Sequence, residues 1–210
     1  MPHNTHLLKT LTIALLVCLV FTPASPAAAG DNLWTSHGPE GGGIYTLAIN
    51  PLMPNVLYAG THFNGVFKST DGGLSWNQTS SGLGNASIYS LAINPTTPDT
   101  LYAGTGIGVY KSTNGGASWS LANSGIPPTM VNLVVIDPLT PDTLYAASNN
   151  GLFKSTDGGA SWSEINTGIP FAMVHNLAID PLTPDTLYAG TDNGVYKTTD
   201  GGAKIGRAHV

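Results

Sequence analysis

One signature recurs at a fixed spacing along the chain and constrains the fold more than any other feature. It reads Ser-Thr-Asp-Gly-Gly-Leu-Ser-Trp at residues 69–76 and returns at 112–119 and 155–162, with a damaged copy from residue 198. Its acid or amide lies at Asp71, Asn114, Asp157 and Asp200, 43 residues apart each time. A fixed period of this length indicates a repeat architecture whose units bury their faces against their neighbours.

Each signature is expected to form the turn of a β-hairpin, because it separates two runs that read as strands. The paired glycines tolerate positive φ, the acid or amide accepts backbone N–H groups, and the flanking hydroxyls can bond the remaining turn groups. The closing tryptophan should begin the next strand and bury its ring against an adjoining layer while its N–H finds an acceptor. These tryptophans are Trp76, Trp119 and Trp162.

Each period contains four short predicted strands. In the first period they are residues 44–49, residues 56–60, the run before the signature and the run that begins at Trp76, with a proline-rich turn at 50–55. This pattern, the 26 glycines and the lack of helical periodicity after residue 29 predict an all-β propeller. The predicted core positions are Leu47, Ile49, Leu57, Tyr58, Phe67 and Trp76, with their equivalents in later repeats.

The pattern Ser/Thr-x-Asp-x-Gly-x-Ser/Thr-Trp resembles the Asp-box, or BNR repeat, of β-propellers such as sialidases, xyloglucanase-like glycosidases and sortilin-type receptors. The resemblance implies blades of four strands, about four of them here, in what is expected to be a truncated ring. It also implies that the acids, the amide and the tryptophans of the signatures are structural turn residues. Each signature has one acid, whereas calcium takes about six to eight oxygens, so we predict no metal site and no cofactor.

The ends of the chain differ from the repeats. Residues 1–29 are predicted to be a signal peptide, with Lys9 before an apolar run at 11–21 and three alanines at 27–29 as a cleavage site. The apolar run is too short to span a bilayer, so we expect a secreted protein, extracellular or periplasmic, without membrane insertion after cleavage. The lone Cys18 lies in this segment, which leaves the mature chain without disulfides.

The mature chain is expected to have three parts. Residues 30–43 should donate a closing outer strand that carries Trp34, and residues 44–203 should form the propeller repeats. Residues 204–210 are predicted to be a non-native tail, because Lys204 and Ile205 replace the Ser-Trp of earlier signatures. One back-translation of residues 205–210 also resembles a sequencing-library adapter.

Charge and arginine content disfavour two classes of function. The formal net charge is −5 and no basic cluster is present, which disfavours nucleic acid as a partner. The only arginine, Arg207, lies in the doubtful tail. Because sialidases of the resembled family hold the substrate carboxylate with an arginine triad, sialidase activity is disfavoured.

A glycoside hydrolase of xyloglucanase-like type stays open as an alternative, since it needs two carboxylates across a cleft. The resemblance places a catalytic acid after the second strand of an early blade, where this chain has His62. The equivalent acid occurs at Asp192, which either serves catalysis or caps the turn at 192–194. The only glutamates are Glu40 and Glu164, and Glu164 is expected on an outer strand facing water. No catalytic residue is therefore assigned.

The preferred hypothesis is an exported, non-catalytic propeller module that binds a protein or polysaccharide partner. Its binding face should include the loops between second and third strands and the loops that join each fourth strand to the next first strand, where the repeats differ most. Equivalent positions at the first-strand starts hold Tyr45, Tyr89, Asn132 and His175. An exposed aromatic beside amides suits stacking on a sugar or peptide, although such residues can also merely cover a core. The candidate binding residues are Phe63, His62, Phe171, Asn149, Asn150 and Asp192.

Overall fold

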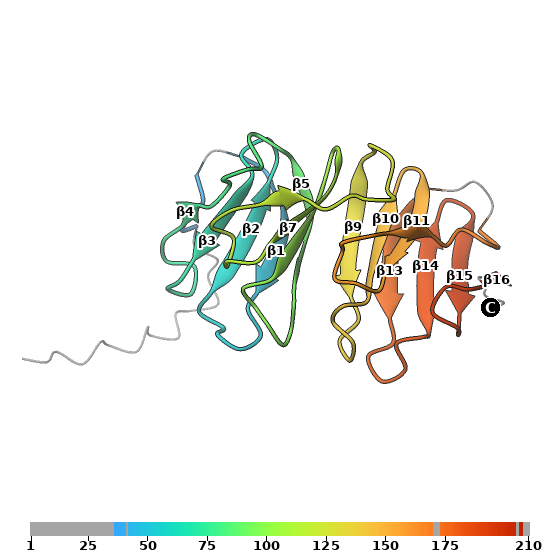
Figure 1. Cartoon of the computed structure of the whole chain (residues 1–210). Coiled ribbons are helices and arrows are strands. Elements are labelled where there is room, and N and C mark those ends of the chain that lie inside the picture. The colour runs from blue at the N-terminus through green and yellow to red at the C-terminus, as the bar shows by residue number, and fades with distance from the viewer. Residues whose placement is uncertain (1–35, 41, 170–172, 205, 208–210) are drawn as a thin grey trace, which may run out of the picture. The chain divides into compact units, whose positions relative to one another are not determined.

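The computed structural model describes residues 36–40, 42–169, 173–204 and 206–207 (Figure 1). The chain divides into two units, 1–36 and 37–210, and all described residues except Ser36 belong to the second. The predicted signal peptide and Trp34 lie outside the described residues. Within the described part all regular elements are strands, and no helix there is long and apolar enough to cross a membrane.

The described strands form four antiparallel sheets of four strands, one for each 43-residue period. The first contains β1 (Ile44–Ile49), β2 (Leu57–Thr61), β3 (Val66–Ser69) and β4 (Asn77–Gln78). The second contains β5 (Ile88–Ile93), β6 (Leu101–Thr105), β7 (Gly108–Ser112) and β8 (Ser120–Leu121). The third contains β9 (Val131–Ile136), β10 (Leu144–Ser148), β11 (Gly151–Ser155) and β12 (Ser163–Glu164). The fourth contains β13 (Val174–Ile179), β14 (Leu187–Thr191), β15 (Gly194–Thr198) and β16 (Gly206–Arg207).

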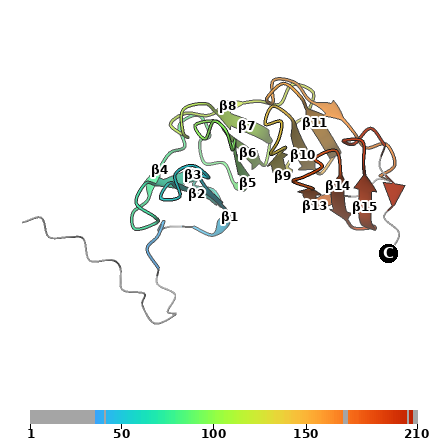
Figure 2. The same ribbon diagram turned by 90° about the horizontal axis from the view of Figure 1, so that it is seen from below.

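Each sheet is a simple meander in which strands adjacent in sequence are adjacent in space. The first strands β1, β5, β9 and β13 lie on the same side of the unit, and each contacts the next (Figure 2). The fold prediction of an all-β chain built from four-stranded units is confirmed.

The apolar core lies between successive sheets rather than within one sheet. Val66 shares a buried cluster with Leu91 of the next sheet, and Val109 shares one with Val134 in the same way. Leu152 and Leu177 repeat the arrangement between the third and fourth sheets. Full burial of one such aliphatic side chain contributes about 1.5–3 kcal/mol, so each sheet depends on its neighbour for stability.

The signatures form the predicted hairpin turns. In the first, the Ser75 N–H and the Ser69 hydroxyl donate to Asp71 Oδ1 at 2.9 and 2.7 Å. The Ser75 hydroxyl donates to Asp71 Oδ2 at 2.5 Å. These hydrogen bonds, chiefly those from Ser75, lower the pKa of Asp71 to about 2. Gly72 and Gly73 have φ of 74° and 91°, which explains the paired glycines.

The other copies of the turn show which parts of the signature are required. The pKa of Asp157 is also lowered to about 2 by its serine hydrogen bonds, first those from Ser161. At Asn114, Oδ1 still accepts from the Ser118 N–H at 2.9 Å, while Nδ2 donates to the Ser118 hydroxyl at 2.8 Å. At Asp200, Oδ1 accepts from the Lys204 N–H at 2.9 Å, so the fourth turn forms without its serine.

A repeated polar contact also joins each sheet to the signature of the next. The Tyr58 hydroxyl and Lys68 Nζ both donate to the Gly115 carbonyl, at 3.1 and 3.0 Å. The same contact recurs from Tyr102 and Lys111 to Gly158, at 2.9 and 2.7 Å. It recurs again from Tyr145 and Lys154 to Gly201, at 3.4 and 3.0 Å. We call this Tyr–Lys–Gly contact the junction.

The tryptophans reach in the opposite direction. Trp119 Nε1 donates to the Thr79 carbonyl and Trp162 Nε1 to the Ala122 carbonyl, each at 2.9 Å and each in the preceding repeat. The predicted acceptor therefore exists, but it lies on a neighbouring sheet. Trp76 differs, because its Nε1 donates to Gly73 in its own signature at 3.1 Å.

The core prediction is wrong at two positions in the first sheet and at Tyr188 in the fourth, which is 39% exposed. Leu47 and Ile49 are 64% and 59% exposed. In later sheets these positions pack against the preceding sheet, as Leu91 shows. No described element covers this face of the first sheet, so the same residue types remain exposed. A repeat pattern identifies which face is apolar, but not whether a neighbour covers it.

Both ends of the described unit bear on the predicted boundaries. Residues 36–40 and 42–43 contain no strand, so the closing strand stays a prediction about the segment outside the described residues. Gly206–Arg207 pair with β15 as β16, with Arg207 opposite Tyr196. Gln78 occupies the equivalent place opposite Phe67 in the first sheet. The non-native origin of residues 204–210 also stays a prediction.

Candidate functional site

One residue at the start of each first strand is displaced from the strand pairing. The register shifts by one residue between Ile44 and Thr46, between Ile88 and Ser90, and between Val174 and Asn176. In the third sheet the shift lies opposite the step from Ala147 to Ser148. Such a bulge leaves one residue unpaired and redirects its side chain. The four bulge residues are Tyr45, Tyr89, Asn132 and His175, which we call the entrance residues.

The strand pairing brings each entrance residue beside the loop between the second and third strands of its own sheet. Ile44 lies opposite Thr61 and Val174 lies opposite Thr191, so the loops that follow these threonines end next to the bulges. The first strands of neighbouring sheets also contact one another. The entrance residues and these loops therefore form one surface, which we call the entrance surface.

The first half of the entrance surface is aromatic. The rings of Tyr45 and Tyr89 stack across two repeats with centroids 5.7 Å apart and planes 19° apart. The ring centroid of His62 lies 4.9 Å from that of Tyr45, and the ring centroid of Phe63 lies 3.7 Å from that of His62. Phe63 is 60% exposed, and Ile107, in the equivalent loop of the second sheet, is 55% exposed. The cluster presents a connected aromatic face to solvent.

Phe63 holds an unfavourable backbone conformation. Its φ is 73°, a region that side chains with a Cβ adopt at a cost of roughly 1–2 kcal/mol. The loop around it is fixed by the Thr61 hydroxyl, which donates to the Gly65 carbonyl at 2.8 Å and accepts from the Asn64 N–H at 3.1 Å. A bulky apolar side chain held outward at a strained position is a feature that folding alone does not require.

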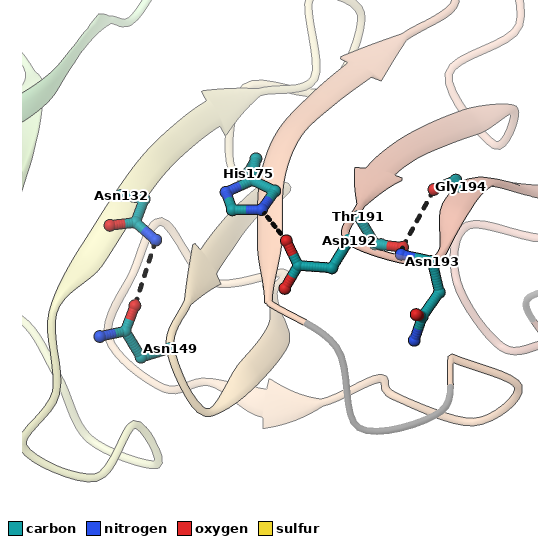
Figure 3. Close-up of polar contacts among 7 residues, drawn as sticks. All are labelled: Asn132, Asn149, His175, Thr191, Asp192, Asn193 and Gly194. Carbon is teal, nitrogen blue, oxygen red and sulfur yellow. Dashed lines mark hydrogen bonds and ion pairs between the residues drawn. The ribbon is translucent and has the colours of Figure 1, made fainter.

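The second half of the entrance surface is polar (Figure 3). Asn132 Nδ2 donates to Asn149 Oδ1 at 3.3 Å, and His175 Nε2 lies 2.5 Å from Asp192 Oδ1. Asn149 and Asn150 are exposed, and the side chains of His175 and Asp192 are 52% and 59% exposed. Amide, imidazole and carboxylate groups thus offer both donors and acceptors to a ligand.

The structure differs from one of the two interpretations of Asp192. The turn at 192–194 is held by Thr191, whose hydroxyl accepts from the Asn193 N–H at 3.1 Å and donates to the Gly194 carbonyl at 3.0 Å (Figure 3). The Asp192 carboxylate points instead to His175. Residue type and turn position suggested a cap, but the preceding threonine performs that role.

Five of the six candidate binding residues lie on the entrance surface, namely His62, Phe63, Asn149, Asn150 and Asp192. The sixth, Phe171, lies outside the described residues. The stacking of Tyr45 on Tyr89 and the pairing of His175 with Asp192 were missed by the sequence analysis. The sequence showed that the four entrance residues occupy equivalent positions in the repeats. It did not show the bulge that turns their side chains toward the loops.

The described entrance residues and their loops contain one acid. Asp192 is the acid found among the entrance residues and their loops, whereas Glu164 is exposed on the outer strand β12 as expected. Asn166 Nδ2 donates to Glu164 Oε1 at 2.5 Å. No group of three His, Cys, Asp or Glu side chains within the described residues has a geometry that could hold a metal ion.

Comparison with solved structures identifies the fold. An ancestral GH74 enzyme matches 86% of this chain with a TM-score of 0.68 and 26% identity. The GH74 xyloglucanase from Xanthomonas campestris matches 80% with a TM-score of 0.66 and 18% identity. The chain has a β-propeller fold.

A third match is a propeller protein that is not described as an enzyme. YCF48 bound to D1 peptide matches 81% of the chain with a TM-score of 0.62 and 15% identity. The chain spans 26% and 30% of the two GH74 proteins and 54% of YCF48. No protein-family model matches the chain, and no curated protein matches it.

Proposed function

We propose that this propeller acts outside the cytoplasm as a non-catalytic module that binds a partner along the entrance surface, and that the partner is a polysaccharide. The connected aromatic group of Tyr45, Tyr89, His62 and Phe63 carries this proposal. Aromatic faces bind the apolar faces of sugar rings, while amides and a carboxylate bind hydroxyl groups. The basic residues of the entrance surface are histidines. This suits an uncharged polysaccharide, because such a ligand has no negative charges to be neutralised.

A protein partner is the other ligand of the same proposal, and YCF48 with its D1 peptide is a propeller of this fold that binds one. The aromatic half and the polar half lie next to each other on the entrance surface, and this arrangement favours a polysaccharide over a protein. A chain of sugar units can stack on the aromatic half and continue over the Asn132–Asn149 and His175–Asp192 pairs.

The test is a binding titration of the full chain against a panel of neutral polysaccharides that includes xyloglucan, with Phe63→Gly as the variant. Glycine removes the ring and also relieves the positive φ, so weaker binding would not result from a misfolded loop. Loss of one stacking contact should weaken binding about 2- to 10-fold. Leu182→Ala is the matched control, since Leu182 is 85% exposed in the β13–β14 turn.

Unchanged affinity in Phe63→Gly, or no binding to any polysaccharide by the wild type, would overturn the polysaccharide assignment. Capture of a peptide ligand that depends on Phe63 would then assign the surface to a protein partner.

The second candidate function is part of a secreted glycoside hydrolase of xyloglucanase-like type. The 26% identity to an ancestral GH74 enzyme favours it, and the exposed Asp192 is the carboxylate available for it on this surface. Hydrolysis by two carboxylates requires a second acid opposite Asp192. Release of reducing ends from xyloglucan by the wild type, lost in Asp192→Asn, would establish the enzyme and refute the non-catalytic module.

A further inference from the structure

The dipeptide Asn-Gly occurs four times among the repeats, and it has a chemistry of its own. The backbone nitrogen that follows an asparagine can attack the carbon of the side-chain amide and close a five-membered succinimide ring. A glycine in the second position leaves this attack unhindered, because it has no Cβ. The four pairs begin at Asn64, Asn114, Asn150 and Asn193. Their surroundings in the fold decide which of them can react.

Asn150 has an exposed and unrestrained side chain. It lies in the two-residue turn between β10 and β11, where Ser148 pairs with Gly151. Its backbone N–H donates to the Ser148 hydroxyl at 3.1 Å, and its carbonyl accepts from Asn166 Nδ2 at 3.3 Å. Its side-chain amide makes no hydrogen bond within the described residues. The amide carbon is therefore free to turn toward the nitrogen of Gly151.

This exposure does not depend on where the chain begins or ends. The third sheet, which contains Asn150, contacts a described sheet on each side through β5 and β13. Asn193 holds the equivalent place in the fourth sheet, at the end of the described unit. Asn150 is therefore the position that we consider further.

Asn114 has the same dipeptide but both of its reacting groups are engaged. Its Oδ1 accepts from the Ser118 N–H at 2.9 Å, and its Nδ2 donates to the Ser118 hydroxyl at 2.8 Å. The Gly115 N–H donates to the Asp99 carbonyl at 2.9 Å, and Gly115 is buried. Ring closure at Asn114 therefore requires the signature turn to open.

Asn149 gives the opposite comparison. It is exposed in the same turn as Asn150, but the residue that follows it is an asparagine and not a glycine. The side chain of that asparagine hinders attack by its backbone nitrogen. One turn thus holds two exposed asparagines, of which one has the reactive neighbour.

The fold requires the glycine of this pair but not the asparagine. A Cβ on Gly151 would lie 2.1 Å from Asn166 Nδ2, and the φ of Gly151 is 121°. The second sheet has Ile107 in the place of Asn150 and still forms the same turn. Asn150 can therefore be replaced or modified without loss of the hairpin.

We propose that Asn150 is a site of spontaneous deamidation, through which the chain alters the charge of its own entrance surface. The Gly151 nitrogen bonds to Asn150 Cγ, the Cγ–Nδ2 bond breaks, and ammonia leaves with the proton of the Gly151 N–H. Water then adds to either ring carbonyl and gives aspartate or isoaspartate. Either product adds a carboxylate beside Asn149 to a polar half that has one acid, Asp192. Isoaspartate also inserts a methylene into the backbone of the turn. This reaction does not depend on the proposed function.

Peptide mapping by mass spectrometry tests the proposal, after incubation of the folded full chain in mildly alkaline heavy-oxygen water. The solvent oxygen labels the product formed during incubation and distinguishes it from conversion during a later digestion in ordinary water. Asn150 should convert about tenfold or more faster than Asn149 and Asn114, since one or two hydrogen bonds change a barrier by that much. Asn150→Gln keeps an amide but would have to close a larger ring, so it should give no labelled product at this position.

Incubation in urea shows whether the fold causes the difference between the two Asn-Gly pairs. Unfolding frees the Asn114 amide and the Gly115 nitrogen, so Asn114 should then convert nearly as fast as Asn150, while Asn149 stays slow. Three results would each overturn the proposal: no labelled product at Asn150 in the folded chain, equal rates at Asn150 and Asn149, or equal rates at Asn150 and Asn114 before unfolding.

Discussion

Two donors share one carbonyl at the second junction, and this arrangement predicts a strongly non-additive effect on stability. The Tyr102 hydroxyl and Lys111 Nζ donate to the Gly158 carbonyl at 2.9 and 2.7 Å. Tyr102 is 1% exposed, and Gly158 is buried as well. The informative substitutions are Tyr102→Phe and Lys111→Met, because each removes one donor and retains most of the side-chain volume.

Either single variant leaves the carbonyl with one donor. Each should therefore cost only the net value of a hydrogen bond, about 0.5–1.5 kcal/mol. The double variant removes both donors and leaves a buried carbonyl unsatisfied, which adds about 1–3 kcal/mol to the sum of the single effects. The predicted coupling is thus a loss of about 1–3 kcal/mol that neither single variant reveals.

Equilibrium urea unfolding of the wild type and the three variants measures this coupling. The matched control is Tyr188→Phe with Lys197→Met on the fourth sheet, where no following signature is present in the described residues. Additive effects at Tyr102 and Lys111, within about 0.5 kcal/mol, would refute the shared-acceptor reasoning.

The remaining predictions concern glycine and titratable positions. Gly125→Ala should cost several kcal/mol more than Gly84→Ala, because a Cβ at Gly125 would lie 2.0 Å from the Trp162 carbonyl oxygen while Gly84 is open, and both have positive φ. Thermal unfolding compares the two variants. The pKa of Asp157 lies at about 2 in the fold against 3.8 for a free aspartate, so its contribution to stability is present above 3.8 and lost as pH falls toward 2. Asp157→Asn should reduce acid sensitivity in that range, measured as unfolding midpoint against pH. Burial raises the pKa of Tyr145 from 10.0 to about 12, so its contribution is present below pH 10 and lost as pH rises toward 12, and Tyr145→Phe should flatten the alkaline decline of the same midpoint.

Much of the fold follows from local chemistry that a sequence displays. The Gly-Gly pairs need positive φ, the adjacent acid or amide accepts turn N–H groups, and each signature therefore ends one strand and begins another. Repetition at 43 residues then fixes the number of sheets in the described unit. Both inferences depend on contacts within a few residues, which is why they are confirmed.

The candidate site was less predictable, because its contacts join residues in different strands and repeats. Phe63 and Asp192 were identified from residue type and from their place in the predicted loops between second and third strands, but their partners were not. Tyr45 stacks on Tyr89 only because a bulge in each first strand turns both rings to the same surface. A one-residue shift in register interrupts the alternation only at the start of the strand, where Val131 and Val134 are buried three residues apart, and so short an irregularity does not identify a bulge. The exposure of Leu47 was missed for a related reason, since coverage depends on a neighbouring sheet and not on the residue itself.

The junctions give the signature a second role beside that of a hairpin turn. The glycine that allows the turn also presents its carbonyl to the Tyr and Lys of the preceding sheet, so the turn conformation and the sheet-to-sheet contact form together. Asn114 supports this view, because the second signature keeps both the turn and the junction at Gly115 without a carboxylate. The repeat requires an oxygen acceptor at this position. The acceptor closes the turn and thereby directs the carbonyl of the following glycine toward the Tyr and Lys of the preceding sheet. The negative charge is dispensable for assembly, and the entrance surface, which takes no part in the junctions, is free to differ from repeat to repeat.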